Sequence, residues 1–126
     1  MKDFNSKNYT LNPYYVERIS WFTCGLYYDG TLLEKGSKRK LFELEKSLNE
    51  AFANGVAVAV SSGEMDLIKY DLNPYKIKSA RFMCYEALYY EDVCLWIGGI
   101  TSMVNMRSWM NGAHLNGICH AIVQNS

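Results

Sequence analysis

Cys119 and His114 come closest to a catalytic arrangement in this sequence. The Asn116-Gly117 pair between them, flanked by apolar residues, is typical of a two-residue type I′ hairpin turn. In that hairpin His114 faces Cys119 across the strands, with the Cβ atoms roughly 5 Å apart. An imidazole at this distance can stabilise a thiolate, the nucleophile of cysteine-dependent enzymes. No acid is placed to orient His114, so we weigh this pair below the alternative of two half-buried hairpin residues.

A basic segment at the start of a predicted helix is the first candidate ligand site. Ser37 is a good N-cap, and Lys38, Arg39 and Lys40 follow it in the first turn. The helix dipole favours acids there, so three cations together with free backbone N–H groups would attract an anion. A phosphate, a nucleotide or an acidic partner loop fits this description, although the spacing of a Walker A loop is absent. The alternative is a solvated basic helix start.

An aromatic sheet face is the second candidate ligand site. Glu91-Asp92 separates two strand-like runs and predicts a hairpin. Because side chains alternate along strands, a two-residue turn places an aliphatic set on the core side and an aromatic set on the other. A solvated sheet face usually carries Lys, Glu and Thr. We therefore expect the aromatic set to be covered by another segment or to bind a partner, a second copy or a flat ligand. Its members include Arg81, Tyr85, Tyr89 and Trp96.

Other chemistry has little support in the sequence. No two of the four cysteines, Cys24, Cys84, Cys94 and Cys119, form a C-x-x-C motif. We expect them to be free thiols in the core. The acidic residues are scattered, and the G-x-S-x-G, H-E-x-x-H and G-x-G-x-x-G motifs are absent. We predict no metal site, no cofactor and no defined catalytic residue.

The elements that must position these residues are mainly strands. Leucines at helical spacing after Ser37 predict one principal helix over about 38–54, ended by Gly55. Residues 101–110 fit a helix or a strand equally well, and no internal repeat is evident. The order favours an α+β fold, a mainly antiparallel sheet with that helix packed on it. The expected strands are 14–28 with a kink at Gly25, 31–34, 56–60, 67–72, 77–90, 93–97 and 118–123.

Composition sets the outer limits. The 126 residues suit a single domain over 1–126, with 1–13 as an extended lead-in. Lys plus Arg and Asp plus Glu balance at 13 each, which argues against nucleic acid or an anionic membrane as partner. No run is long and apolar enough to span a bilayer, and the amino terminus lacks the apolar core of a secretory signal. We expect a cytoplasmic protein.

These observations favour a non-enzymatic binding or regulatory protein, such as an inhibitor, an immunity-type protein or a protein that sequesters a ligand. Its partner would be a protein or an anionic, nucleotide-like molecule. The chain has 10 Tyr, 5 Phe and 3 Trp, and such rings suit contact surfaces as well as cores. Two alternatives remain: a small enzyme using Cys119 and His114, and a structural subunit of a homo-oligomer.

Overall fold

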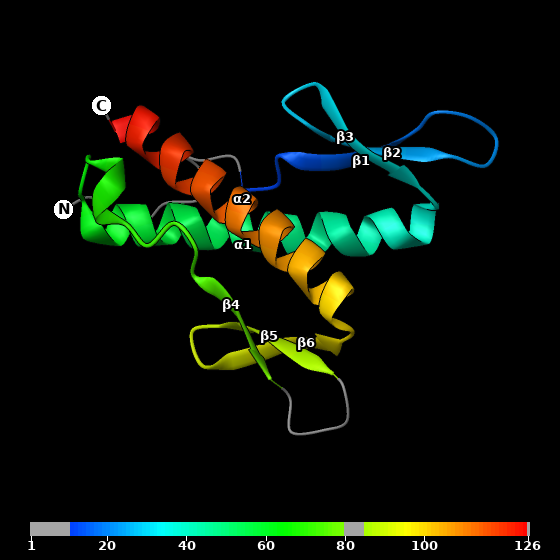
Figure 1. Cartoon of the computed structure of the whole chain (residues 1–126). Coiled ribbons are helices and arrows are strands. Elements are labelled where there is room, and N and C mark those ends of the chain that lie inside the picture. The colour runs from blue at the N-terminus through cyan, green and yellow to red at the C-terminus, as the bar shows by residue number, and fades with distance from the viewer. Residues whose placement is uncertain (1–10, 80–84, 126) are drawn as a thin grey trace.

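Two sheets and two long helices make up the described part of the chain. The computed structural model describes residues 11–79 and 85–125. Figure 1 shows the sheets on opposite sides of a pair of crossing helices. The α+β class with antiparallel sheets is confirmed, but the described chain has two sheets instead of one. Residues 101–110, which fitted a helix or a strand equally well, belong to a second long helix. The order is β1 (Tyr14–Arg18), β2 (Cys24–Tyr28), β3 (Thr31–Gly36), α1 (Lys38–Ser62), the 3₁₀ turn η2 (Leu67–Lys69), β4 (Tyr75–Ser79), β5 (Glu86–Tyr90), β6 (Val93–Gly98) and α2 (Ile100–Asn125).

The same strand-strand-strand-helix unit occurs twice in the chain. β1 and β4 share one pattern of burial, and β2 and β5 share another. A β-bulge interrupts both sheets at the matching place, between Leu26 and Tyr27 and between Leu88 and Tyr89. The following turns open with Asp29 and Glu91, both at positive φ, 52° and 55°. The expectation that the chain has no internal repeat is therefore wrong.

Each half docks its first strand on its own helix through one buried asparagine. The Asn49 side chain accepts from the backbone N–H of Tyr14 at 2.9 Å and donates to its carbonyl oxygen at 3.0 Å. Asn111 does the same for Tyr75, at 2.8 and 3.1 Å. Buried backbone groups need such partners, so each amide stands in for a neighbouring strand.

Two further asparagines tie the halves to each other. Asn116 on α2 donates to the phenolic oxygen of Tyr14 at 3.0 Å, and Asn54 on α1 donates to that of Tyr75 at 3.2 Å. Burial raises the pKa of both phenols to about 12. Each tyrosine belongs to one half and its donor to the other, so the two hydrogen bonds join the halves. The buried apolar residues of both halves also form one continuous cluster.

The helices cross where two glycines meet. A Cβ on Gly55 would overlap the carbonyl oxygen of His114, and a Cβ on Gly117 would overlap that of Phe52. Buried alanines lie one turn before and after each glycine, because residues four apart share a helix face. The small stripes Ala51-Gly55-Ala59 and Ala113-Gly117-Ala121 therefore let the two backbones touch.

These glycines also explain two wrong predictions. Gly55 does not end the first helix, which continues to Gly63, where φ is 69° and the N–H bonds to Ala59 at 2.9 Å. The expected strand 56–60 is helical, with Val56, Ala59 and Val60 buried at helical spacing. Asn116-Gly117 is likewise no hairpin turn, because it lies inside α2, and the expected terminal strand 118–123 belongs to the same helix.

The strands were predicted too long. The expected strand 14–28 is the β1–β2 hairpin, with a loop before Gly25 rather than a kink at it. Within the expected strand 77–90, β4 and β5 are separate antiparallel strands, and 67–72 holds the turn η2 instead of a strand. The turns at Asp29-Gly30 and Glu91-Asp92, and strands at 31–34 and 93–97, are confirmed.

Candidate binding surfaces

The predicted pairing of Cys119 with His114 is not formed. Both residues lie on α2, and residues five apart on a helix point to different sides. His114 packs against the rings of Tyr75 and Tyr90 in the second sheet. Cys119 lies near Tyr28 of the first sheet, whose pKa is raised first by burial, then by the charge of Asp29 and last by Cys119. Helix geometry thus removes the arrangement on which the thiol-enzyme alternative rested.

His114 occupies the place that Phe52 fills in the first half. Tyr14 and Tyr28 stack at 4.6 Å and cover Phe52, and Tyr75 and Tyr90 stack at the same distance and cover His114. Neither ring nitrogen of His114 has a hydrogen-bond partner within the described residues, and burial lowers its pKa. The imidazole therefore serves as a buried ring, in a cage whose other copy holds a phenyl group.

The three cations of the basic helix start point to different places. Successive helical residues are turned by about 100°, so Lys38, Arg39 and Lys40 leave the helix in three different directions. Lys38 lines a groove beside the β1–β2 loop, and Lys40 lines a cleft between the two halves. Arg39 is exposed and lines neither. Ser37 is the N-cap as predicted, and its hydroxyl accepts from the backbone N–H of Lys40 at 3.3 Å.

The loop joining β1 to β2, here called the tip loop (residues 19–23), presents two exposed aromatic rings. Trp21 is 81% exposed and Phe22 is 93% exposed. The backbone N–H groups of Ile19 and Ser20 both donate to the carbonyl of Thr23, at 2.9 and 3.0 Å. These bonds close the loop, so the rings are held outward by a fixed backbone.

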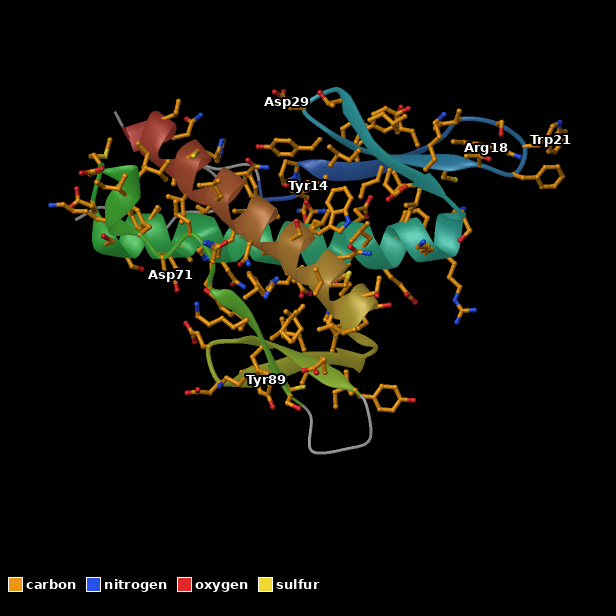
Figure 2. The ribbon with its side chains drawn as sticks, viewed as in Figure 1. Tyr14, Arg18, Trp21, Asp29, Asp71 and Tyr89 are labelled. Carbon is orange, nitrogen blue, oxygen red and sulfur yellow. The ribbon has the colours of Figure 1, made fainter. Side chains whose placement is uncertain are left out.

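The Arg18 side chain holds the tip loop in place. Its guanidinium donates to the carbonyl oxygens of Ser20 and Trp21, both at 3.1 Å, and lies 5.2 Å from the Trp21 ring centre. Figure 2 shows Arg18 and Trp21 together at the outer end of the hairpin, away from the second sheet. Three interactions from one side chain preorganise the loop.

A groove of about 510 Å³, here called the tip groove, runs between this loop and the start of α1. Among the described residues its lining contains two cations, three aromatic rings and no acid. Lys38 lies 5.7 Å from the ring centre of Phe42, which is 43% exposed. The full lining is Val16, Arg18, Ser20, Trp21, Phe22, Thr23, Cys24, Lys38 and Phe42. This site was not predicted, because Trp21 and Phe22 were assigned to the expected strand 14–28. Neighbouring strand residues point to opposite faces, so two adjacent large rings there were the available sign that one of them is exposed.

The predicted aromatic face is divided by the bulge in the second sheet. Trp96 pairs with Leu88, which is fully buried, so Trp96 lies on the helix side of the sheet. Tyr89 lies on the outer side, where the Lys78 ammonium sits 4.9 Å from its ring centre. Tyr85 precedes β5 and is 44% exposed. Leu95 is the extra residue of the β-bulge, which the simple alternation from a two-residue turn does not include. Arg81 lies outside the described residues.

A cleft of about 370 Å³, here called the axial cleft, lies between the two halves. It brings together Lys40 and Trp96, two predicted site residues from different elements. Four pairs of its lining residues occupy matching positions in the two repeats: Glu34 and Trp96, Lys40 and Ser102, Glu43 and Asn105, and Leu44 and Met106. Met103 and Trp109 of α2 also contribute. The cleft therefore lies between corresponding parts of the two repeats.

β6 forms an unusually apolar edge of the second sheet. Val93 and Ile97 are 60% and 62% exposed, and Cys94 is an exposed free thiol, contrary to the expectation of a core position. The matching edge strand β3 carries the exposed charges Glu34 and Lys35. Edge strands are normally protected by charges of this kind.

Neither a metal-ligand cluster nor a membrane-spanning helix is found among the described residues. Among residues 11–79 and 85–125 there is no group of three or more His, Cys, Asp or Glu side chains that could hold a metal ion. Over the same residues no helix has the length and apolar character needed to cross a membrane. Cys24 and Cys119 are free and partly buried, and Cys84 lies outside the described residues.

Comparison with known proteins gives no match. No family model, no curated protein and no solved structure is similar to this chain.

Proposed function

We propose that this protein is a non-enzymatic binding protein whose tip groove engages an acidic, partly apolar segment of a protein partner. The observation that carries the proposal is the rigid display of Trp21 and Phe22 beside cations. Trp and Arg are the residue types that most often dominate protein interfaces, and a preorganised loop loses little entropy on binding. An inhibitor or an immunity-type regulator would use such a surface.

Charge determines the kind of partner. Arg18 and Lys38 line the groove, and none of its described lining residues is acidic. Carboxylates of a partner would complement these cations, while apolar side chains would cover the rings. The anion expected from the sequence would then be a carboxylate of a protein partner. A nucleotide-like ligand is the alternative.

Selection of displayed random peptides against the immobilised protein tests the proposal. We expect enriched peptides to combine acidic and large apolar residues. Affinity should fall roughly 10- to 100-fold in the Trp21→Ser/Phe22→Ser variant, because central aromatic anchors contribute the most binding energy. Lys38→Glu should weaken binding as well, and more so at low salt.

The control is Ile68→Ser, which removes a side chain that is 82% exposed on η2, remote from the tip loop. Its affinity should equal that of the wild type. Circular dichroism should be unchanged in all variants, since the altered side chains are mostly solvated. Selected peptides without acids, equal binding by the Trp21/Phe22 variant, or equally tight binding of free nucleotides to the groove would each refute the proposal.

The exposed apolar edge favours a second candidate, a homo-oligomer built through β6. Two copies of Val93–Gly98 can pair in antiparallel fashion without bringing charges together, because this strand has none. Ile100 and Val104 of α2 are also exposed, at 51% and 38%, and would add apolar area to the paired backbones. A standard interface buries roughly 800 Å² per partner.

Giving β6 the residues of β3 tests this candidate. In Val93→Thr/Ile97→Lys the edge acquires Thr31 and Lys35 of the first repeat. We expect light scattering to show a dimer for the wild type and a monomer for this variant, with Ile68→Lys remaining a dimer. A wild-type monomer at millimolar concentration, or dissociation by Ile68→Lys as well, would exclude the β6 dimer.

A reducing, cytoplasmic location belongs to the same proposal. Cys94 is a solvent-exposed thiol on an unprotected edge, and Cys24 and Cys119 are unpaired. Exposed thiols of this kind suit a compartment that keeps them reduced.

A further inference from the structure

The axial cleft has two chemically different walls, although its walls come from two copies of one unit. The first repeat contributes all three charged residues, Glu34, Lys40 and Glu43. The second contributes both indole rings, Trp96 and Trp109. Filling space between two repeats does not require such a division, so the division itself indicates a ligand with two kinds of surface.

The charges favour one sign of ligand. Two glutamates and one lysine are the charged residues of the described lining, which is therefore negative overall. Within the described part of the chain the ion pairs are Lys69–Glu64 and Lys76–Asp71, neither of which involves the cleft. Glu34 accepts one hydrogen bond, from the backbone N–H of Lys35 at 3.2 Å, and neither Glu34 nor Glu43 pairs with a cation, so carboxylate oxygens of both are available to a ligand. Indole faces also attract cations through the ring quadrupole.

The size and floor of the cleft limit the ligand further. Its 370 Å³ lies near the lower end of the roughly 300–1,000 Å³ typical of small-molecule sites. Leu44 and Met103 at its base are 9% and 5% exposed, so the floor is apolar and packed. A ligand must place an apolar body here and direct its charge to the glutamates.

We propose that the axial cleft binds a small organic cation, an ammonium or guanidinium group on an apolar or aromatic body. This site is separate from the tip groove and does not depend on the proposed protein-binding role. Lys40 limits the affinity for a cation, because its ammonium repels one. The residue at the matching position of the second repeat is the neutral Ser102.

Titration with three matched probes, followed by NMR of the indole N–H signals, tests the proposal. The probes are 2-phenylethylammonium, neutral 2-phenylethanol and anionic phenylacetate. We expect the ammonium to bind about tenfold more tightly than the alcohol, as a cation near aromatic rings and carboxylates should. Signals of Trp96 and Trp109 should shift, while Trp21, in the tip loop, provides the internal control.

Two variants distinguish charge-dependent binding from nonspecific hydrophobic binding. Glu43→Gln keeps the shape and should weaken ammonium binding about fivefold, and Lys40→Ser should strengthen it about threefold. Both residues are exposed, so folding should be retained. Equal affinity for the three probes, shifts confined to Trp21, or no change in either variant would overturn the proposal, whatever the outcome at the tip groove.

Discussion

Gly117→Ala is expected to lower the free energy of unfolding by at least about 3 kcal/mol, because the new methyl group would overlap a backbone atom. The carbonyl oxygen of Phe52 occupies the space where the Cβ would lie, and the backbone nitrogen of Val56 is 3.1 Å away. Neither is the flexible end of a side chain, so α1 and α2 would have to separate. Gly55→Ala should be similarly destabilising, since it meets His114 and Ile118 in the same way.

Gly112→Ala is the matched control on the same helix. A Cβ there meets no atom within 4 Å. Because alanine is the better helix former, this variant should be more stable by about 0.5–1 kcal/mol. Urea unfolding followed by circular dichroism measures all three variants. Equal stability of Gly117→Ala and Gly112→Ala would show that the glycine crossing is not what fixes the helix pair.

Exchanging the caged rings is expected to change stability in opposite directions. Phe52→His places two nitrogens under Tyr14 and Tyr28 and should cost about 2–4 kcal/mol at pH 7. His114→Phe removes two buried nitrogens that have no hydrogen-bond partner in the described structure, and should add about 1–2 kcal/mol. The first repeat already shows that a phenyl ring fits such a cage.

The pH dependence of the same variants gives a second readout. Burial is the main cause that lowers the pKa of His114 below 6.5, and the carboxylate of Asp71 opposes it weakly. The unfolded chain therefore takes up this proton at higher pH than the folded chain. The stability associated with the neutral imidazole is present above about pH 6.5 and is lost as the pH falls below that value towards the lowered pKa.

His114→Phe should remove this loss, so its unfolding free energy should change less between pH 7 and pH 5 than that of the wild type. Urea titrations at a series of pH values measure the difference. An unchanged pH profile would mean that the imidazole is hydrated in the folded protein.

The sequence contained the repeat, although local patterns concealed it. Asn-Pro-Tyr occurs at 12–14 and 73–75, Leu-Tyr-Tyr at 26–28 and 88–90, and Asn-Gly at 54–55 and 116–117. Comparing the two halves would have predicted two equal units, and hence a second helix after 99. Interpreting Gly55 as the end of a helix and Asn116-Gly117 as a hairpin turn hid that symmetry, because both pairs lie inside helices.

Local chemistry by itself determined the α+β class, the antiparallel pairing, the turns at Asp29 and Glu91, and the Ser37 cap. Each depends on residues near one another in the chain, whose backbone preferences suffice. Packing decided the rest. Gly55 and Gly117 are helical because two backbones meet there, and His114 and Cys119 face different sheets because they share a helix. Lys40 and Trp96 meet in one cleft because two repeats, far apart in sequence, fold around a common axis.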